Sequence, residues 1–127
     1  MRVMVTGAGG MLGSDVVDAC LARGHDVIAL TREELDITTR EVDHVVSARR
    51  PEAVVNCAAW TDVDAAESRE REAMVVNDTG AGLLAVAAAQ VGAKVIHPST
   101  DYVFDGSGSV PFVESDLPAP LSAYGRS

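Results

Sequence analysis

The feature that most constrains the fold is a set of glycines at three-residue spacing near the start of the chain. The apolar run Arg2–Thr6 has strand character, and the residues GAGGMLG that follow place Gly7, Gly10 and Gly13 at the turn into a segment with helical apolar spacing. Gly7 can adopt the positive φ of a sharp turn. Gly10 lacks a Cβ and lets a pyrophosphate approach the backbone, where the helix N-terminus favours an anion, and Gly13 allows close helix–sheet packing. The pattern predicts a dinucleotide-binding turn; a tight βα turn with chance glycines is the alternative.

Strand and helix patterns alternate along the rest of the chain. Such alternation predicts parallel βαβ units with right-handed crossovers, and continuously apolar strands are expected where helices cover both faces. We therefore expect an α/β fold, a Rossmann-type doubly wound parallel sheet, with residues 1–127 forming one dinucleotide-binding domain. The expected strands are 2–6, 26–30, 53–59 and 93–99, and the expected helices are 11–24, 38–50 with Thr38 or Thr39 near the N-cap, and 68–91.

The residues after Ser99 have a different composition, rich in Gly, Ser, Pro and Asp. The turn-forming sequence DGSGS separates two stretches that we expect to be extended, Tyr102–Phe104 and Val110–Val113. A loop this long inside a domain is functional or disordered. We favour a functional loop, because it follows the carboxyl end of a parallel strand, where open α/β sheets bind ligands.

The charge of the chain limits its partners. With 19 acidic and 10 basic residues, the net charge of −9 argues against nucleic acid or an anionic membrane surface, but not against a small anionic ligand. No apolar run approaches the roughly 20 residues of a membrane span. The first residues lack the pattern of a signal peptide, so a cytoplasmic location is expected. Cys20 and Cys57 are expected to be buried, reduced thiols.

The end of the second expected strand bears on cofactor preference. An acid there would accept the ribose 2′-hydroxyl of NAD, whereas an arginine suits the 2′-phosphate of NADP. Thr31 occupies the position of the acid, and Arg32 could pair with a phosphate, although Glu33 and Glu34 follow at once. We expect NADPH, with NADH as the second option. A solvated surface charge is the alternative role for Arg32.

Five motifs, in order along the chain, carry a family resemblance. They are GAGGMLG, LDIT, NCAAWTDVDAAE, HPSTDYVFDG and PLSAYG. Together they resemble the dTDP-4-dehydrorhamnose reductases, within the extended branch of the short-chain dehydrogenase/reductase superfamily. The resemblance runs from Met1 to Ser127, and STDYVFDG is its most specific part. It implies NAD(P)H-dependent reduction of the C4 ketone of dTDP-4-dehydro-L-rhamnose to dTDP-L-rhamnose, a reaction of a dTDP-sugar.

Site residues follow from this resemblance together with the glycine turn and the end of the second strand. Three of them have structural alternatives: Asp36 as a helix cap, Trp60 as a packing residue where the family more often has His or Tyr, and Thr100 as a strand-end hydroxyl, with Ser99 able to take either role. The expected cofactor-binding residues are Gly7, Gly10, Met11, Leu12, Thr31, Arg32, Asp36, Ile37, Ala58, Ala59, Trp60, Thr61, Pro98 and Tyr124; Thr100 and Asp101 are expected to bind substrate, and Thr100 and Tyr124 to be catalytic.

The family's catalytic chemistry depends on a tyrosine. A free phenol has a pKa of about 10, and a nearby lysine ammonium lowers it. The family's tyrosine is followed by lysine four residues later, whereas Tyr124 is followed by Gly125, Arg126 and Ser127, and Arg126 at i+2 would face away on a helix. We expect the N-terminal portion of a longer enzyme, truncated before the last strands and the substrate domain, with little turnover. Tyr124 should be poorly ordered or held by its neighbours.

Two other functions stay open: a nucleotide-sugar epimerase or dehydratase of the same superfamily, and a non-catalytic cofactor-binding subunit like that of methionine adenosyltransferase. STDYVFDG argues against the first, and the presence of both Thr100 and Tyr124 argues against the second. Asp62, Asp64 and Glu67 are interpreted as an exposed acidic loop, and no metal is expected. The oligomeric state is open, a homodimer included.

Overall fold

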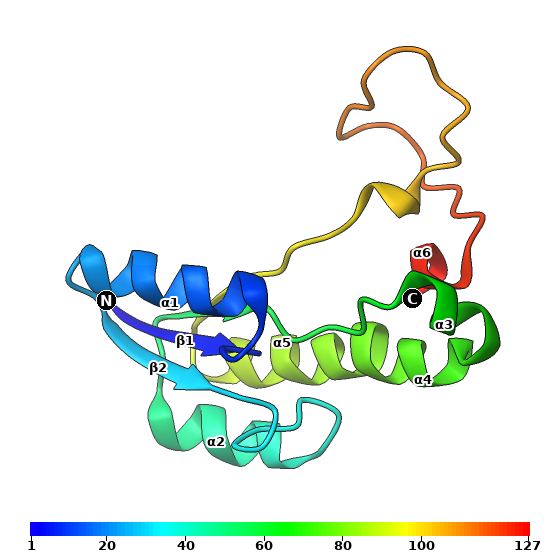
Figure 1. Ribbon diagram of the computed structural model, residues 1–127. Coiled ribbons are helices and arrows are strands. Elements are labelled where there is room, and N and C mark those ends of the chain that lie inside the picture. The colour runs from blue at the N-terminus through cyan, green and yellow to red at the C-terminus, as the bar shows by residue number, and fades with distance from the viewer.

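The computed structural model describes residues 1–127 as a small parallel sheet with helices on both faces and a long irregular segment that projects away from it (Figure 1). The strands are β1 (Arg2–Thr6), β2 (Asp26–Leu30), β3 (Ala53–Asn56) and β4 (Lys94–Ile96). The α-helices are α1 (Met11–Ala22), α2 (Glu41–Arg49), α3 (Val63–Ser68), α4 (Glu70–Met74), α5 (Ala81–Gln90) and α6 (Ala123–Arg126), and the shorter turns are the π-helical η1 (Val75–Gly80) and the 3₁₀ η2 (Asp101–Val103).

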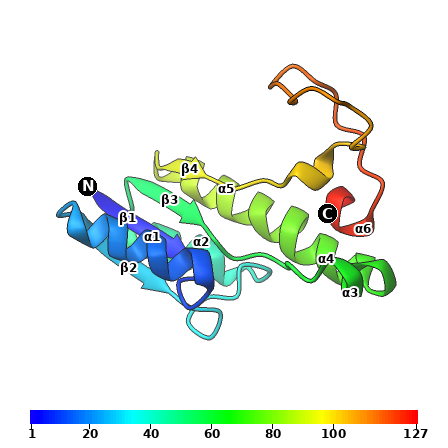
Figure 2. The same cartoon turned by 45° about the horizontal axis from the view of Figure 1, so that its top comes forward.

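The sheet has four strands in the order β2-β1-β3-β4, all parallel. Val3 of the central β1 is paired with Val27 on one side and with Ala53 on the other. Helix α1 covers one face, and α2 and α5 pack together on the opposite face (Figures 1 and 2). The expected α/β, doubly wound parallel sheet of the Rossmann type is confirmed, and the carboxyl ends of its strands lie along one edge.

The hydrophobic core fills the space between the sheet and the α2–α5 pair. Met4 and Val54 point into it from the central strands, and Val46 and Leu84 meet them from the helices; all four are fully buried. The burial of the strands decreases toward β4, where Ile96 is 57% exposed. β4 is therefore an exposed edge strand.

Two strands are shorter than predicted. β3 ends at Asn56 rather than at residue 59, because its neighbour β1 turns away at Gly7; the Cys57 N–H still donates to the Thr6 carbonyl, but the ladder does not continue beyond it. β4 ends at Ile96 rather than at residue 99, and Pro98, which has no backbone N–H to donate to a ladder, follows two residues later. Both shortened ends release loop residues at the carboxyl edge of the sheet.

The prediction of a single long helix over residues 68–91 is wrong in detail. The helical path begins at Glu70 and passes through α4, the π-helical η1 and α5, so its central turn is wider than an α-helix. The preceding residues, predicted as a polar loop, form α3, whose N-cap Asp62 accepts a 2.9 Å hydrogen bond from the N–H of Ala65. An alanine-rich sequence shows helical character but does not reveal a π turn.

The two extended stretches predicted after Ser99 do not form strands. Tyr102 lies in η2, and Val110–Val113 forms no strand. The projecting segment is held instead by Phe104 and Phe112, whose rings stack with centroids 4.1 Å apart. Within the whole chain, no helix is both long and apolar enough to cross a membrane.

Candidate functional site

The glycine turn brings the end of β1 against the loop that follows β3. Gly7 has a φ of +65°, and a Cβ there would lie 2.6 Å from the backbone nitrogen of Ala58. A Cβ at Gly13 would lie 2.1 Å from the Gly7 carbonyl oxygen, so α1 can pack this closely only through glycine. Gly10 is the N-cap of α1 and offers no side chain to the first N–H groups. These groups are free to bind an anion such as a pyrophosphate.

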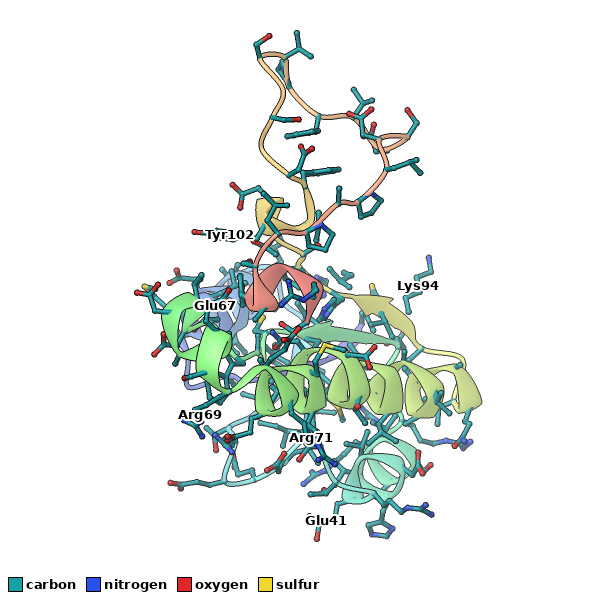
Figure 3. The ribbon with its side chains drawn as sticks, turned by 90° about the vertical axis from the view of Figure 1, so that its right-hand side faces the viewer. Glu41, Glu67, Arg69, Arg71, Lys94 and Tyr102 are labelled. Carbon is teal, nitrogen blue, oxygen red and sulfur yellow. The ribbon has the colours of Figure 1, made fainter.

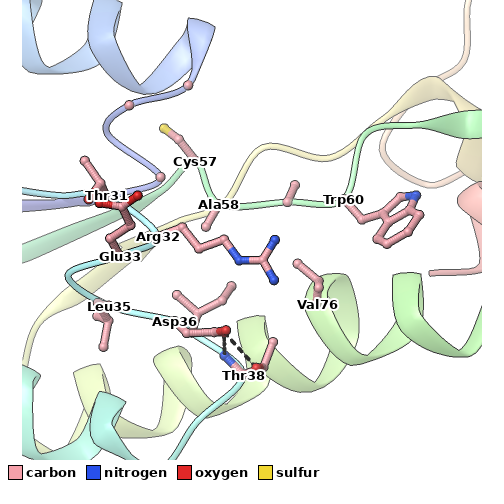
Figure 4. A pocket seen from close by; sticks show the side chains of 15 residues that line it. Thr31, Arg32, Glu33, Leu35, Asp36, Thr38, Cys57, Ala58, Trp60 and Val76 are labelled. Atoms are coloured by element: carbon pink, nitrogen blue, oxygen red, sulfur yellow. Dashed lines mark hydrogen bonds between the residues drawn. The ribbon is translucent and has the colours of Figure 1, made fainter.

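A cavity of about 500 Å³ lies at the carboxyl edge of the sheet (Figure 4). Four chain segments form its walls: the glycine turn, the residues after β2, the loop after β3, and η1 through Val76. It is the first of two neighbouring cavities, and we call it the cofactor cavity. Of the residues predicted from the sequence, it is lined by Gly7, Gly10, Thr31, Arg32, Asp36, Ile37, Ala58, Ala59 and Trp60.

Arg32 reaches across the cofactor cavity without an ionic partner in the protein (Figure 4). The acid beside it, Glu34, is turned back to Thr31, whose N–H and hydroxyl donate to its carboxylate at 2.8 and 3.0 Å. These two hydrogen bonds lower the pKa of Glu34. The wall after β2 therefore contains the free guanidinium of Arg32 and the acidic residue Glu33, whereas Glu34 is hydrogen-bonded to Thr31 and does not line the cavity.

Asp36 forms a local turn in the wall of the same cavity. Its Oδ1 accepts from the N–H of Thr38 at 2.9 Å and from the Thr38 hydroxyl at 2.7 Å (Figure 4). The Thr38 hydroxyl and N–H lower the pKa of Asp36. Thr39 lies next to Arg40, the N-cap of α2, as predicted, but its hydroxyl donates to the Asp36 carbonyl at 2.9 Å and does not cap the helix.

A second cavity of about 290 Å³ lies beyond the loop that follows β3. We call it the tyrosine cavity, because Tyr124 lines it together with Pro98 and Thr100. Ala59 lines both cavities, so they meet at this residue. The Thr100 hydroxyl accepts from the N–H of Tyr102 at 3.3 Å, so the structural role considered for Thr100 coexists with its position in the cavity.

Tyr124 is held by its neighbours, one of the two outcomes expected for it. Its ring makes a T-shaped contact with Tyr102, with centroids 5.6 Å apart. The helix that carries it, α6, packs against α3, α4 and η2. A four-residue helix has little stability of its own, so these tertiary contacts provide its order.

Four of the predicted site residues lie outside both cavities. Met11 and Leu12 lie in the first turn of α1 and are 89% and 50% exposed, so their side chains do not contribute to either cavity. Thr61 is exposed beyond the loop after β3, and Asp101 lines a separate shallow hollow beside Tyr102. For these side chains the structure offers no enclosed ligand site.

Trp60 separates the cofactor cavity from the helices behind it. Its indole N–H donates to the Asp62 carbonyl at 2.8 Å, and the guanidinium of Arg69 lies 4.7 Å from the ring centroid. The ring also packs on a small alanine cluster that includes Ala66 and Ala123. The predicted packing role is therefore present, and the ring still forms part of the cavity wall.

A chain of polar side chains, which was not predicted, runs from buried Thr6 and Asn56 to exposed His97 in the wall of the tyrosine cavity. Oδ1 of Asn56 accepts from the Thr6 hydroxyl at 2.6 Å and from the Ala58 N–H at 3.2 Å. Because Oδ1 is the acceptor, Nδ2 of Asn56 is the donor to Nδ1 of His97, 3.0 Å away. These bonds link β1, β3 and the chain after β4. An asparagine ending an apolar strand was the one signal in the sequence.

The cysteines and acidic residues also differ from expectation. Cys20 and Cys57 are free but only half-buried, and Cys57 lines the cofactor cavity, where partial burial raises the pKa of its thiol. Asp62 and Glu67 are exposed, as expected, but they are the N-cap and a residue of α3 and accept from backbone N–H groups, so they do not form an open loop. No cluster of three or more His, Cys, Asp or Glu side chains is arranged to bind a metal.

Comparison with known proteins adds to this geometry. The chain is 47% identical over 126 residues to a dTDP-4-keto-6-deoxy-D-glucose reductase of Streptomyces niveus, covering 98% of this chain and 44% of that protein. It is also 47% identical over 130 residues to the dTDP-4-dehydrorhamnose reductase of Mycobacterium tuberculosis, covering 99% of this chain and 42% of the relative. The chain therefore spans less than half the length of the curated relatives it matches.

A solved structure is also similar to this chain. A dTDP-4-dehydrorhamnose reductase from Bacillus anthracis, solved in complex with NADP, superposes with a TM-score of 0.95 at 40% identity, covering 98% of this chain and 45% of that one. The family model described as the RmlD substrate binding domain matches residues 1–127. The chain therefore belongs to the RmlD substrate binding domain family, and its resemblance to the dTDP-4-dehydrorhamnose reductases is confirmed.

Proposed function

We propose that residues 1–127 are the dinucleotide-binding domain of an oxidoreductase that reduces the C4 ketone of dTDP-4-dehydro-L-rhamnose to dTDP-L-rhamnose. The observation that carries the proposal is the junction of the two cavities at Ala59. A dinucleotide whose pyrophosphate lies on the glycine turn would extend along the cofactor cavity toward the cavity of Thr100 and Tyr124. That arrangement brings the nicotinamide end of the cofactor next to a hydroxyl pair that can bind a ketone.

The residues of the cofactor cavity fit a dinucleotide. Gly10 leaves the first N–H groups of α1 open to phosphate oxygens, and the Gly7 turn needs a residue without a Cβ. A bound nicotinamide would supply the hydride for the ketone carbon. In the tyrosine cavity, the phenol of Tyr124 would give its proton to the ketone oxygen, and the Thr100 hydroxyl would hold that oxygen in line.

NADPH is the proposed cofactor, with NADH as the second option. Arg32 supports NADPH, because an unpaired guanidinium in the cavity wall can bind a 2′-phosphate. The NADP complex of the Bacillus anthracis relative also supports it. The Glu34 carboxylate beside Thr31 is the feature that keeps NADH open, because a carboxylate there can accept from a ribose hydroxyl.

The alternatives are not favoured. The relatives with the highest identities reported above are named as reductases rather than epimerases or dehydratases. Against a non-catalytic subunit, Thr100 and Tyr124 line the same cavity, which a protein without catalytic activity does not require. The proposal further includes a dTDP-sugar as small-molecule partner and a cytoplasmic location. Sedimentation would show whether the protein forms a homodimer.

The test is a calorimetric titration with NADPH and NADH, followed by turnover with dTDP-4-dehydro-L-rhamnose in the intact protein. Gly10→Glu is the matched variant, because it places a carboxylate where the pyrophosphate should lie. We expect NADPH to bind more tightly than NADH, and the variant to bind neither. Binding of both nucleotides unchanged in the variant would exclude the glycine turn as the phosphate site.

A further inference from the structure

We propose that Glu67 is a positioning residue for Tyr124, because its carboxylate holds the first N–H of the helix that carries the tyrosine. Glu67 lies near the end of α3, and Ala123 begins α6, 56 residues later. The N–H of Ala123 donates to Oε1 of Glu67 at 2.8 Å. Figure 3 shows Glu67 beside the α6 ribbon. The inference rests on the proposed role of Tyr124 as proton donor.

The start of α6 needs an acceptor from elsewhere in the chain. The first N–H groups of any helix lack partners within the helix. Ser122, the N-cap, satisfies one of them by accepting from the N–H of Gly125 at 3.0 Å. In a capping box, a Glu or Gln three residues after the N-cap returns its side chain to the helix start. In α6 that position is Gly125, which has no side chain to return.

Packing explains why Gly125 cannot be replaced by a capping glutamate. A Cβ at Gly125 would lie 2.2 Å from the carbonyl oxygen of Tyr102 and 3.1 Å from Pro120. At Gly125, α6 therefore contacts η2 through backbone atoms, and a carboxylate for the first turn of α6 has to come from another element. Glu67 of α3 supplies it, and a negative charge at a helix N-terminus is also favoured by the helix dipole.

The bond from Glu67 acts at the residue next to Tyr124. The methyl group of Ala123 is fully buried in a cluster with Ala66 and Ala73, so the helix start is held by packing on one side and by the carboxylate on the other. At the other end of α6, Arg126, which also lines the tyrosine cavity, forms a 2.7 Å ion pair with Glu70. Because Tyr124 follows Ala123 directly, rotation of the first turn would move the phenol within its cavity.

The experiment compares three substitutions of Glu67 in the intact protein. Glu67→Ala removes the acceptor, Glu67→Gln retains an amide oxygen at the same reach, and Glu67→Asp retains the charge but shortens the side chain. Glu114→Ala is the control, since Glu114 is exposed and makes no side-chain hydrogen bond. We measure kcat and KM, the Kd of NADPH, and hydrogen exchange at the Ala123 amide.

For Glu67→Ala and Glu67→Asp we expect kcat to fall by about 10- to 100-fold through misplacement of the phenol. The Kd of NADPH should stay within about twofold, because the cofactor cavity does not include Glu67. Glu67→Gln should restore kcat, and exchange at Ala123 should accelerate only in the Ala and Asp variants. Wild-type kcat in Glu67→Ala, or in Glu67→Asp, would overturn the proposal.

If the proposed reductase function is wrong, the experiment gives a result that differs from the one expected when only the role of Glu67 is wrong. If the wild-type protein reduces no dTDP-sugar, the reductase assignment fails while the exchange measurement still tests Glu67. Slow exchange at Ala123 in the wild type and in Glu67→Gln, but not in Glu67→Ala, would then support the positioning contact alone. Equal exchange in all variants would overturn it.

Discussion

Asn77 exchanges two hydrogen bonds with the main chain of Trp60. The N–H of Trp60 donates to Oδ1 of Asn77 at 2.8 Å, and Nδ2 of Asn77 donates to the Trp60 carbonyl at 3.1 Å. The same Nδ2 donates to the Ser127 hydroxyl at 2.9 Å, and that hydroxyl donates to the Tyr124 carbonyl at 2.7 Å. One side chain of η1 therefore connects the loop shared by the two cavities with the helix of the candidate proton donor.

The substitution Asn77→Ala should destabilise the protein and weaken nucleotide binding. The substitution removes three hydrogen bonds, each with a net value of about 1 kcal/mol. Because water replaces part of them, we expect the free energy of unfolding to fall by about 2 kcal/mol. Urea unfolding measures this loss, and calorimetry the change in Kd. Thr79→Ala, at an exposed residue of the same π turn, should stay within about 0.5 kcal/mol of wild type. Equal effects of the two substitutions would contradict the role of Asn77.

The fold was predictable because its signals are local. The glycines of the first turn, the apolar strands and the helical periods each depend on neighbouring residues, and together they determine a parallel sheet. Most of the cofactor cavity was predictable for the same reason. Gly10, Arg32 and Ala59 follow strands whose carboxyl ends share one edge, so their proximity follows from the topology.

The remaining features depend on contacts between distant segments. The π turn that aims Asn77 at Trp60 has no signature in an alanine-rich helix, and the pairing of Glu67 with Ala123 spans 56 residues. The two extended stretches predicted on either side of residues 105–109 failed for the same reason: Tyr102 lies in η2, which packs against α6, and Val110–Val113 forms no strand. Sequence periodicity carries no information on such tertiary contacts.

Substitution of a helix glycine by alanine should change the stability of the protein in opposite directions in α1 and in α5. Gly13→Ala in α1 forces a methyl group into the Gly7 carbonyl oxygen, and overpacking of this kind costs about 1–3 kcal/mol or more. Gly82→Ala in α5 meets no atom within 4 Å and should stabilise the helix by about 0.5–1 kcal/mol. Urea midpoints of the two variants measure both effects. A stable Gly13→Ala variant that binds NADPH normally would show that α1 can shift without consequence.

The carboxyl group of Asp36 should contribute to acid sensitivity. Its pKa is lowered from an ordinary value near 3.8 by the hydroxyl and N–H of Thr38, so the folded state binds this proton more weakly than the unfolded state. The stabilisation is therefore present above about pH 4 and is lost as the pH falls through the lower, folded pKa. Thr38→Val removes the hydroxyl and should raise the pKa of Asp36 in a ¹³C NMR titration.

Thr39→Val provides the control for that titration. The Thr39 hydroxyl donates to the backbone carbonyl of Asp36 and not to its carboxylate, so the pKa of Asp36 should not change in this variant. An identical titration of Asp36 in both variants would remove the Thr38 hydroxyl as the cause of the lowered pKa.

Arg32 should decide between the two nicotinamide cofactors. Its guanidinium has no acidic partner in the protein and lines the cofactor cavity, so a 2′-phosphate would be its first ionic contact. A charge-assisted hydrogen bond of this kind is worth about 1.5–3 kcal/mol, so Arg32→Ala should raise the Kd of NADPH by roughly 10- to 100-fold and leave that of NADH nearly unchanged. Arg71→Ala, on the exposed surface of α4, is the matched loss of one positive charge and should affect both nucleotides slightly and equally. Equal losses of affinity for NADPH and NADH in Arg32→Ala would mean that the arginine contacts a part common to both nucleotides. The preference for NADPH would then have to come from another residue, and Thr31 and its partner Glu34 would be the next to substitute.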